Sequence, residues 1–331
     1  MIRTVTVAPY KMFGGQGNKA RGIVKCISDH KDIQNYSIPI FSENVEFDLE
    51  LDKESEDYDL CIQNVDFKNF VKTPYVDVGI FEPAFKKIRY IDNYVRLLDY
   101  AIVFGEKQKE CLGKKVSDKV RVARPTIMPM ERPSKQKAAF SKFTFYTSTF
   151  EEYTNLDLVL LSYLTSFSIN DKVNLTILSP DPNSMVEYIA SIKSDIGRFG
   201  TIDMYPEITL RAECNSFSEF QCLIDASMGY DLSINTMLSV ASGNPVIASS
   251  SNAICEWVND GIYKFESNEG SRNSFLIGDV PISSSLSEKM LSAFHESKKF
   301  QEMQAALIED SYKSFYPDNK QTVGEILCSL L

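Results

Sequence analysis

Glycines cluster close to the N-terminus of this 331-residue chain, in the stretch YKMFGGQGN. Gly14, Gly15 and Gly17 lack a Cβ, so the backbone there can approach a ligand closely and can adopt positive φ angles. Backbone amides in such a turn can point at a phosphate or at a sugar hydroxyl. The stretch is therefore a candidate phosphate loop, although a structural turn explains the same glycines equally well.

A second candidate lies further along the chain, in the stretch TMLSVASGNPVIAS. A short apolar helix is followed there by Gly243 and Pro245, which favour a turn into a buried strand. The N-terminus of this helix would face a bound ligand, and helix N-termini favour anions such as a diphosphate. The stretch therefore predicts a second place at which an anionic ligand can bind.

The elements that must position these residues alternate along residues 1–130. The sequence shows five short runs of strand character, RTVTVAP, YDLCIQN, TPYVDVGIF, YAIVFG and VRVARP. A helix follows the glycines, with apolar residues at helical spacing from Ala20 to Ile27, and another is predicted from about Ile88 to Asp99. The alternation predicts a first domain with a parallel sheet covered by helices.

A polar, basic stretch at 131–142 predicts a linker, and a second domain of the same kind is predicted over 143–310. Its strands are KFTFYTS, KVNLTILSP and GNPVIAS, and an apolar stripe from Leu156 to Phe167 predicts a helix. Another helix is predicted at SFSEFQCLIDAS, where Ser216 and Glu219 form a capping box. The tail from Leu286 is predicted to be helical and interrupted near Pro317, and its last part, 311–331, is predicted to cross back to the first domain.

Two such domains have a consequence for ligand binding. In open parallel sheets, ligands bind outside the carboxyl ends of the strands. Two facing domains place both of these edges on one cleft, so that one can hold a donor and the other an acceptor.

The composition excludes several other classes of protein. With seven scattered cysteines, no CxxC pair and two histidines, neither a disulfide framework nor a histidine-rich metal site is expected. The sequence shows neither a signal-peptide pattern nor a run of apolar residues long enough to span a membrane, so we expect a cytoplasmic protein. The net charge of −10 argues against non-specific nucleic-acid binding by the molecule as a whole.

One region departs from this acidic balance. Residues 106–142 hold eleven Lys or Arg residues against four acids, Lys114, Lys115 and Arg121 among them. A solvated helix face followed by a linker explains this stretch, and the alternative is a docking place for an anionic acceptor such as DNA.

Several stretches, in order along nearly the whole chain, resemble one family. They are GGQGNKA, LLDYAIVFGEKQKECL, FTFYTSTFEEYTNLDLVLLSYL and the segment from FSEFQCLIDAS to NAICEWVNDG. They resemble retaining glycosyltransferases of group 1, or family 4, which use nucleotide sugars. The pair YDLCIQNVDF and VDVGIFEPAF is similar to a subgroup with a Gln before the acceptor-side loop and a Glu after the next strand. The resemblance implies an α/β chain of GT-B fold, in which two Rossmann-like domains face each other across a cleft.

The chain departs from this family at its charged positions. Two glutamates of the family fall on Tyr230 and Leu238, although Asp231 lies beside the first of them. An Arg and a Lys of the family would fall in TSTFEEYTN, which has no basic residue and keeps only Asn155 of the final Lys-Asn. A histidine of the family falls on Asn64. Since oxyanion donors contribute roughly 3–4 kcal/mol each, these departures should slow the loss of a diphosphate considerably.

The resemblance nevertheless implies roles for residues of this chain. Glu82 is the predicted acceptor-side base or polar contact, and Asp231 the predicted contact to sugar hydroxyls. The predicted donor-binding residues are Thr147, Ser148, Thr149, Asn155, Ser179, Asn235, Thr236 and Ser239. The predicted acceptor-side and phosphate-loop residues are Gly14, Gly15, Gly17, Asn18, Gln63 and Asn64. No metal or cofactor is expected besides a UDP- or GDP-linked sugar as the donor substrate.

Three functions remain open from the sequence. The first is a metal-independent glycosyltransferase with a diverged site, of viral or mobile-element origin, acting on DNA bases or on a glycan. The second is an inactive GT-B-fold protein that serves as a binding module, or as the silent subunit of a complex with a protein partner or with copies of itself. The third is a sugar-phosphate enzyme of related fold, such as an epimerase, and the missing basic residues count against it.

Overall fold

The computed structural model describes residues 1–12, 14–40, 57–83, 87–88, 90–128, 141–149, 154–199, 205–212, 214, 217–227, 229–230, 232–273, 276–315 and 321–331. Most of the predicted linker, Ser216 of the predicted capping box, Asp231 and Pro317 lie outside these residues. So do Glu151 and Glu152.

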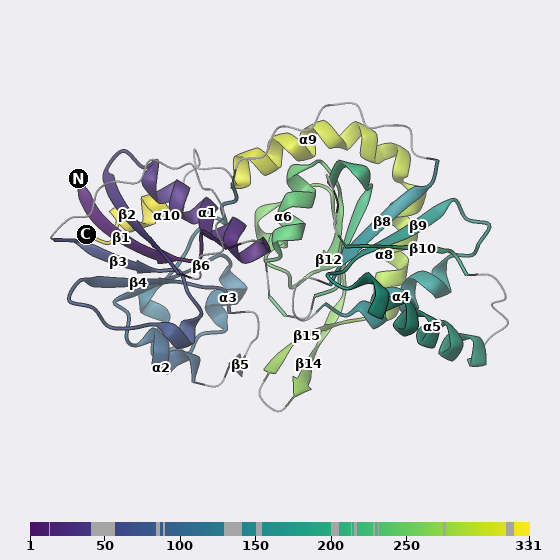
Figure 1. Ribbon diagram of the computed structural model, residues 1–331, viewed down its shortest axis with the longest axis horizontal. Helices are drawn as coiled ribbons and strands as arrows, with labels where there is room; N and C mark the ends of the chain where they lie inside the picture. Colours follow the sequence, from purple (N-terminus) through teal and green to yellow (C-terminus); the bar gives the residue numbers. More distant parts are fainter. Residues whose placement is uncertain are drawn as a thin grey trace.

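The first sheet has six parallel strands in the order β2-β1-β3-β4-β6-β7 (Figure 1). Its strands are β1 (Ile2–Ala8), β2 (Ile33–Pro39), β3 (Leu60–Gln63), β4 (Val76–Ile80), β6 (Tyr100–Val103) and β7 (Val120–Val122). Residues on β3 and β4 are buried almost throughout, as expected for strands of a parallel sheet covered on both faces. All five strands predicted in this part of the chain are confirmed, and β2 was not predicted.

The helices of this part are short except for the first. They are α1 (Gly14–Ser28), η1 (Phe67–Asn69), α2 (Ile91–Val95), α3 (Glu106–Glu110) and η2 (Ser117–Lys119). The helix predicted from Ile88 to Asp99 is too long, because α2 covers only five residues and Lys87–Ile88 forms the strand β5. Tyr90 has a φ of 68°, in the left-handed region, so the helix cannot extend through it towards Ile88.

The second sheet also has six parallel strands, in the order β10-β9-β8-β11-β12-β13. Its strands are β8 (Phe143–Ser148), β9 (Val173–Leu178), β10 (Glu207–Arg211), β11 (Cys222–Asp225), β12 (Val246–Ser249) and β13 (Ile262–Phe265). The helix predicted at SFSEFQCLIDAS is wrong. Only Phe217–Glu219 is helical, as the 3₁₀ turn η3, and Cys222–Asp225 pairs with both β8 and β12 in the middle of the sheet.

The helices of this part are longer, with one exception of four residues. They are α4 (Leu156–Ser166), α5 (Pro182–Phe199), α6 (Ile234–Ala241), α7 (Ile254–Trp257), α8 (Ser283–His295) and α9 (Ser297–Phe315). The last helix, α10 (Val323–Cys328), lies against α1 beside the first sheet (Figure 1). A Cβ on Gly324 would lie 3.0 Å from the ring of His30 and 3.2 Å from the carbonyl oxygen of Cys26, so a side chain here would have to displace these neighbours slightly.

A small third sheet connects the two halves of the molecule. The hairpin of β14 (Ser267–Asn273) and β15 (Leu276–Pro281) extends from the second half, and β15 pairs antiparallel with β5 of the first. Figure 1 shows this hairpin reaching towards β5. The sequence analysis did not predict the hairpin.

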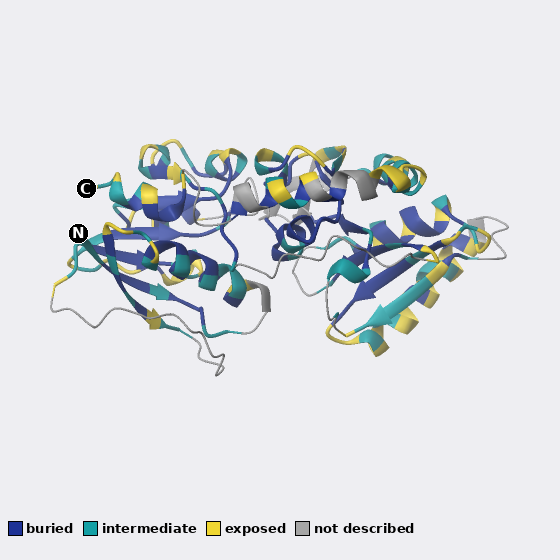
Figure 2. Ribbon diagram, turned by 90° about the horizontal axis from the view of Figure 1, so that it is seen from above, coloured by how far each residue is buried: buried dark blue, intermediate teal, exposed yellow. Residues whose placement is uncertain are grey.

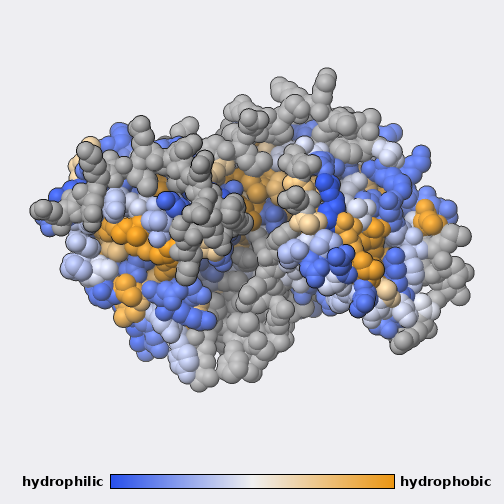
Figure 3. All heavy atoms as spheres, in the orientation of Figure 1, coloured by the Kyte–Doolittle hydropathy of each residue, from blue (hydrophilic) through white to orange (hydrophobic). Residues whose placement is uncertain are grey.

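The largest apolar core belongs to both halves. It joins Ile62 and Ile102 of the first sheet to Tyr146 and Val246 of the second. The view from above shows buried residues in both sheets and exposed residues on the outer surfaces of the helices (Figure 2). Hydrophobic residues also gather at the middle of the face drawn in Figure 3, between the two sheets. Within the described residues, no helix combines the length and the apolar character that crossing a membrane requires.

Candidate active site

The predicted phosphate loop forms the first turn of a helix. α1 begins at Gly14, so the glycines belong to the helix and not to a separate loop before it. A Cβ on Gly17 would lie 1.9 Å from the carbonyl oxygen of Met12, so no side chain fits there. The guanidinium of Arg21 donates hydrogen bonds to the carbonyl oxygens of Tyr10 (3.0 Å) and Met12 (2.8 Å). The geometry gives Gly17 a packing role, and the binding of a phosphate at this turn stays a prediction.

Glu82 lies just after β4 and forms an ion pair across the same edge of the sheet. Its carboxylate oxygens lie 2.9 and 3.1 Å from Nζ of Lys19, on the second turn of α1. Both side chains are largely buried, with 16% of Glu82 and 20% of Lys19 exposed. Lys19 was not predicted, because nothing in the sequence links it to a residue 63 positions away. Asn18, next to Lys19, has a buried Oδ1 without a hydrogen-bond partner among the described residues.

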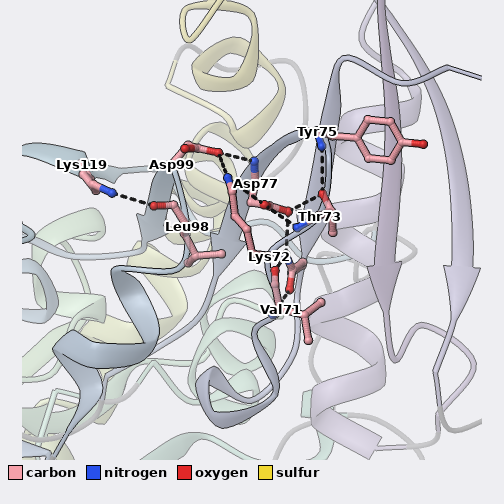
Figure 4. Close-up of polar contacts among 9 residues, drawn as sticks. Val71, Lys72, Thr73, Tyr75, Asp77, Leu98, Asp99 and Lys119 are labelled. Carbon is pink, nitrogen blue, oxygen red and sulfur yellow. Dashed lines mark hydrogen bonds and ion pairs between the residues drawn. The ribbon is translucent and has the colours of Figure 1, made fainter.

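Gln63, at the end of β3, makes hydrogen bonds that stabilise the first sheet. Its amide accepts a hydrogen bond from the backbone N–H of Val71 (2.9 Å) and donates to the carbonyl oxygen of Val71 (2.7 Å) and to Oδ1 of Asp77 (3.0 Å). Asp77 also accepts from the backbone N–H and the hydroxyl of Thr73 (Figure 4). This buried network holds the loop before β4. Asn64, the next residue after Gln63, is only half-buried, and an acceptor contact by either residue stays a prediction.

In the second half of the chain, a pocket of about 450 Å³ opens at the carboxyl end of β8. It is lined by Thr149, Thr154, Asn155, Leu156, Asp157, Met185 and Tyr188. The volume lies in the range of small-molecule sites. Thr149 and Asn155 are two of the predicted donor-binding residues, and Nδ2 of Asn155 also donates to the carbonyl oxygen of Ala226 (2.7 Å).

The charge of this pocket does not suit a diphosphate. Among the described residues that line it, Asp157 is the charged one, and there is no Lys or Arg. Burial and the nearby Asp157 carboxylate both raise the pKa of Tyr188, so its phenol is neutral at physiological pH. The pocket therefore offers hydroxyl and amide groups but no cation.

The α6 residues predicted to bind the donor lie mostly inside the protein. Ser233 caps the helix, and its hydroxyl accepts from the backbone N–H groups of Asn235 (3.1 Å) and Thr236 (3.4 Å). Thr236 and Ser239 are fully buried, and only Asn235 is partly exposed. The buried phenol of Tyr146 neighbours Ser239, and burial raises the pKa of this phenol well above its usual value. A donor contact by Thr236 or Ser239 would need α6 to move.

The remaining predicted donor residues lie at the ends of β8 and β9. Thr147 and Ser148 are buried, as is Ser179, whose hydroxyl accepts from the backbone N–H of Asp181 (3.3 Å). Asp231 lies outside the described residues. Thr149, Ser179 and Asn155 thus lie at the carboxyl edge of the second sheet.

A buried carboxylate, which the sequence analysis missed, stands at the centre of this edge. Asp225 is the last residue of β11 and only 6% exposed. It accepts hydrogen bonds from the backbone N–H and hydroxyl of Ser227, from the hydroxyl of Thr236 (2.6 Å) and from Nδ2 of Asn252 (3.1 Å). Asp225 ends the apolar run CLID. If this run had been predicted to be a strand, the acid at its carboxyl end would have indicated a candidate site residue.

Leu238 takes part in packing. It is half-buried and packs against the core shared by the two halves. The turn after it needs a glycine, because Gly243 has a φ of 75° and a Cβ there would lie 2.6 Å from Cγ of Gln304. The position at which the family carries an acid is therefore part of the apolar interior here.

The two carboxyl edges are tied together by direct contacts. The carboxylate of Glu256, on α7, accepts from the backbone N–H groups of Glu106 (2.7 Å) and Lys107 (3.2 Å) at the start of α3. Nε1 of Trp257 donates to the carbonyl oxygen of Phe104 (2.6 Å), and Nζ of Lys107 donates to that of Ser250 (2.9 Å). These contacts join the end of β6 to the loop and helix after β12.

In the described part of the basic stretch at 106–142, several Lys and Arg side chains form hydrogen bonds within the protein. Nζ of Lys119 donates to the carbonyl oxygen of Leu98 (2.8 Å), and Arg121 donates to that of Asp118 (2.7 Å). Lys114 and Lys115 are exposed. No group of three His, Cys, Asp or Glu side chains among the described residues is arranged to hold a metal ion.

Comparisons with known proteins find likeness in structure alone. No protein-family model matches the sequence, and no curated protein matches it either. The solved structure of HepE from Anabaena in complex with UDP-glucose is similar over 99% of this chain and 100% of its own, with a TM-score of 0.65 and 11% identity. Sucrose-phosphate synthase from Thermosynechococcus elongatus is similar over 100% of this chain and 98% of its own, with a TM-score of 0.65 and 12% identity.

A third solved structure is that of WaaG, a glycosyltransferase involved in lipopolysaccharide biosynthesis. It is similar over 99% of this chain and 98% of its own, with a TM-score of 0.60 and 13% identity. The chain therefore has the GT-B fold from end to end. The predicted resemblance to glycosyltransferases of this class is confirmed at the level of the fold.

Proposed function

We propose that the chain binds a nucleotide sugar between its two sheets and transfers the sugar to an acceptor, without a metal ion. The observation that carries this proposal is the GT-B fold along the entire chain, with polar side chains at both facing carboxyl edges. Such an arrangement can hold a donor on one side and an acceptor on the other.

The donor and the acceptor bind to different halves of the chain. The donor lies against the second sheet, where Thr149, Asn155 and Asn235 offer hydroxyl and amide groups. The acceptor lies against the first turn of α1 and the Lys19–Glu82 pair. In this pair Lys19 holds the carboxylate of Glu82 in place, and Glu82 can accept a proton from an acceptor hydroxyl only when this bond loosens.

Transfer by this site should be slow. The described residues of the donor pocket include no cation to stabilise the departing diphosphate. The cations at the carboxyl edges already have partners: Lys19 and Lys107 of the first half are hydrogen-bonded, and Arg211, the last residue of β10, pairs with Glu219. Because stabilisation of developing charge contributes roughly 3–4 kcal/mol per donor, each missing contact should lower the rate by a factor of about 100 to 1000.

A second function is favoured by the same observations. Leu238 is half-buried against the core, and the described residues of the donor pocket include no basic side chain, so the chain is also suited to bind a sugar nucleotide without transferring the sugar. It would then act as a binding module or as the silent subunit of a larger assembly, with a protein partner or a second copy of itself.

The first experiment measures thermal stability against a panel of UDP- and GDP-linked sugars and the free nucleotides. A ligand that binds the native state raises the melting temperature by mass action. The proposal expects a shift with one nucleotide family, reduced by Asn155→Ala in the pocket and kept by Asn170→Ala on an exposed turn. Release of the free nucleotide then separates transfer or hydrolysis from binding alone. A folded protein that responds to no member of the panel would contradict both functions.

A further inference from the structure

The strand β10 (Glu207–Arg211) forms one edge of the second sheet, beyond β8 and β9 (Figure 1). Among the described strands it is hydrogen-bonded to β9 alone. Its residues are half-buried or exposed, whereas those of β8, β9, β11 and β12 are nearly all buried. An edge strand presents backbone groups to which a strand of another molecule can pair. The second sheet can therefore be extended at β10.

The backbone of β10 determines which of its groups point outward. The carbonyl oxygen of Arg211 accepts a hydrogen bond from the backbone N–H of Ser179, the residue after β9 (2.9 Å). In a strand, the N–H and C=O of one residue point to the same side, and those of the next residue point to the opposite side. Ile208 and Leu210 therefore direct their N–H and C=O groups away from β9.

The side chains of β10 form a charge pattern that is complementary to its own reverse. Glu207 begins the strand, Arg211 ends it and Thr209 lies midway, all on one face because side chains alternate. If a second copy runs antiparallel with Thr209 opposite Thr209, each Glu207 lies opposite Arg211 of the other copy. Ile208 then lies opposite Leu210, and these two residues exchange their outward N–H and C=O groups. The charges and the backbone thus favour the same register.

The charges of β10 also have neighbours of opposite sign within the chain. Lys142 forms an ion pair with Glu207, and 49% of each side chain is exposed. The guanidinium of Arg211 lies 2.7 Å from the carboxylate of Glu219, with 33% of each side chain exposed. In the antiparallel pairing these charges alternate in sign, from Lys142 and Glu207 of one copy to Arg211 and Glu219 of the other. Opposite charges on paired strands stabilise the pair, and like charges destabilise it.

We infer that two copies of this chain form a dimer through β10, with their second sheets joined into one continuous sheet across a two-fold axis. Such a contact is isologous, because both copies use the same strand. The inference goes beyond the proposed function and does not depend on it.

The first measurement is the sedimentation of the native protein over a concentration series. A contact between two sheet edges is small and binds weakly, so the series runs from about 1 μM to about 1 mM. The inference expects monomer at the low end and dimer at the high end. Glu207→Lys places like charges opposite each other at both ends of the strand pair, because the two-fold axis repeats every change. It should raise the dissociation constant at least about fivefold, and so should Arg211→Glu.

Mixing the two variants separates the predicted pairing from damage to the fold. Glu207→Lys carries two bases on the strand and Arg211→Glu carries two acids, so each variant repels a copy of itself. In a mixed dimer every base faces an acid, and the mixture should dimerise at least about fivefold more tightly than either variant alone. Glu110→Lys and Arg96→Glu make the same changes on exposed residues of the first half, and neither they nor their mixture should alter the native constant.

A cysteine at the centre of the strand tests the register. Thr209 lies opposite its own copy at a pair without backbone hydrogen bonds, where Cβ atoms are about 4.5–5.5 Å apart, and a small shift brings two thiols within disulfide distance. Oxidation with copper phenanthroline should therefore link two copies of Thr209→Cys through position 209, as read by mass spectrometry of the linked peptide. Asn93→Cys, on the exposed side of α2, should form no such link.

Each result decides for or against β10 as the contact. A native protein that stays monomeric throughout the series overturns the inference. A native dimer that neither charge variant weakens, or that mixing does not restore, uses another surface and also overturns it. Weakening by each variant, recovery in the mixture and the link at position 209 support it. The panel of nucleotide sugars is a separate measurement, so the proposed function can fail while the dimer stands.

Discussion

Leu238 packs against the core at the position that the resemblance to glycosyltransferases aligns with an acid. The side chain is half-buried and packs against apolar residues of both halves, so an acid there would lose solvation without gaining a partner. Restoring the acid typical of the family should therefore destabilise the protein.

We expect Leu238→Glu to lower the free energy of unfolding by about 1–3 kcal/mol, the range for a polar group buried without a partner. Leu161→Glu is the matched control, because Leu161 lies on α4 with 40% of its surface exposed and should change stability by no more than about 0.5 kcal/mol. Denaturant unfolding followed by circular dichroism measures both. Equal stability of the two variants would show that position 238 tolerates charge.

Two thiols, the buried Cys61 and the half-buried Cys255, should make the stability depend on pH. Burial, with a contribution from Asp77, raises the pKa of Cys61 to about 11, and burial raises that of Cys255 to about 11. In the unfolded chain the thiols ionise near their ordinary pKa of about 8.5, so their contribution to stability is complete below that pH. It should be lost as the pH rises from about 8.5 to about 11.

The check is alkylation by iodoacetamide, read by mass spectrometry. Because only the thiolate reacts, Cys61 and Cys255 in the folded protein should react at pH 8 at least tenfold more slowly than in the urea-unfolded chain. Equal rates in the folded and unfolded chain would contradict the assigned burial.

At the scale of elements, the first turn of α1 is shaped by packing. Gly17 meets the carbonyl of Met12, so Gly17→Ala must displace either the loop or the helix. We expect a loss of about 1–3 kcal/mol, the range for overpacking of an interior. Gly197→Ala, on the exposed side of α5, meets nothing closer than 3.5 Å and should stabilise by up to about 1 kcal/mol, since alanine favours a helix. Thermal unfolding of the two variants should therefore move in opposite directions.

Strands that a local sequence pattern marks were predictable, and strands that only pairing defines were not. The buried strands β3, β4, β6, β8, β9 and β12 are compact β-branched or apolar runs, which local sequence shows directly. β11 was misread because its four residues follow a helical turn, and only pairing with β8 and β12 makes them a strand. The hairpin of β14 and β15 and its pairing with β5 join residues almost 190 positions apart, and no local pattern encodes such a contact.

The same reasoning explains the candidate site. Thr149 and Asn155 line a pocket at the carboxyl end of β8, where the sequence placed them, and their role as donor contacts stays a prediction. Thr236 and Ser239 have the right residue types, but the rotation of α6 about its axis turns them inward, and this rotation is set by tertiary packing. The partners of Asp225 and Glu82 could not be predicted, since each pair joins different elements.

For the whole molecule, direct contacts hold the two halves together. Glu256 caps α3 from the opposite half, and the adjacent Trp257 donates to Phe104 and stacks on Arg124, whose guanidinium lies 5.5 Å from the ring centroid. β15 and β5 add a second link. The shared core and these links favour one fixed arrangement of the halves.

Trp257 is the single tryptophan of the chain, so its fluorescence reports on this contact without labelling. We expect Glu256→Ala to remove the cap of α3, to weaken the contact by about 1 kcal/mol and to shift the emission of Trp257 to longer wavelength with stronger quenching by acrylamide. Glu187→Ala, an exposed acid on α5, is the control for the change of net charge. If the two variants give the same emission and quenching, Glu256 does not hold the halves together, and the shared core alone must do so.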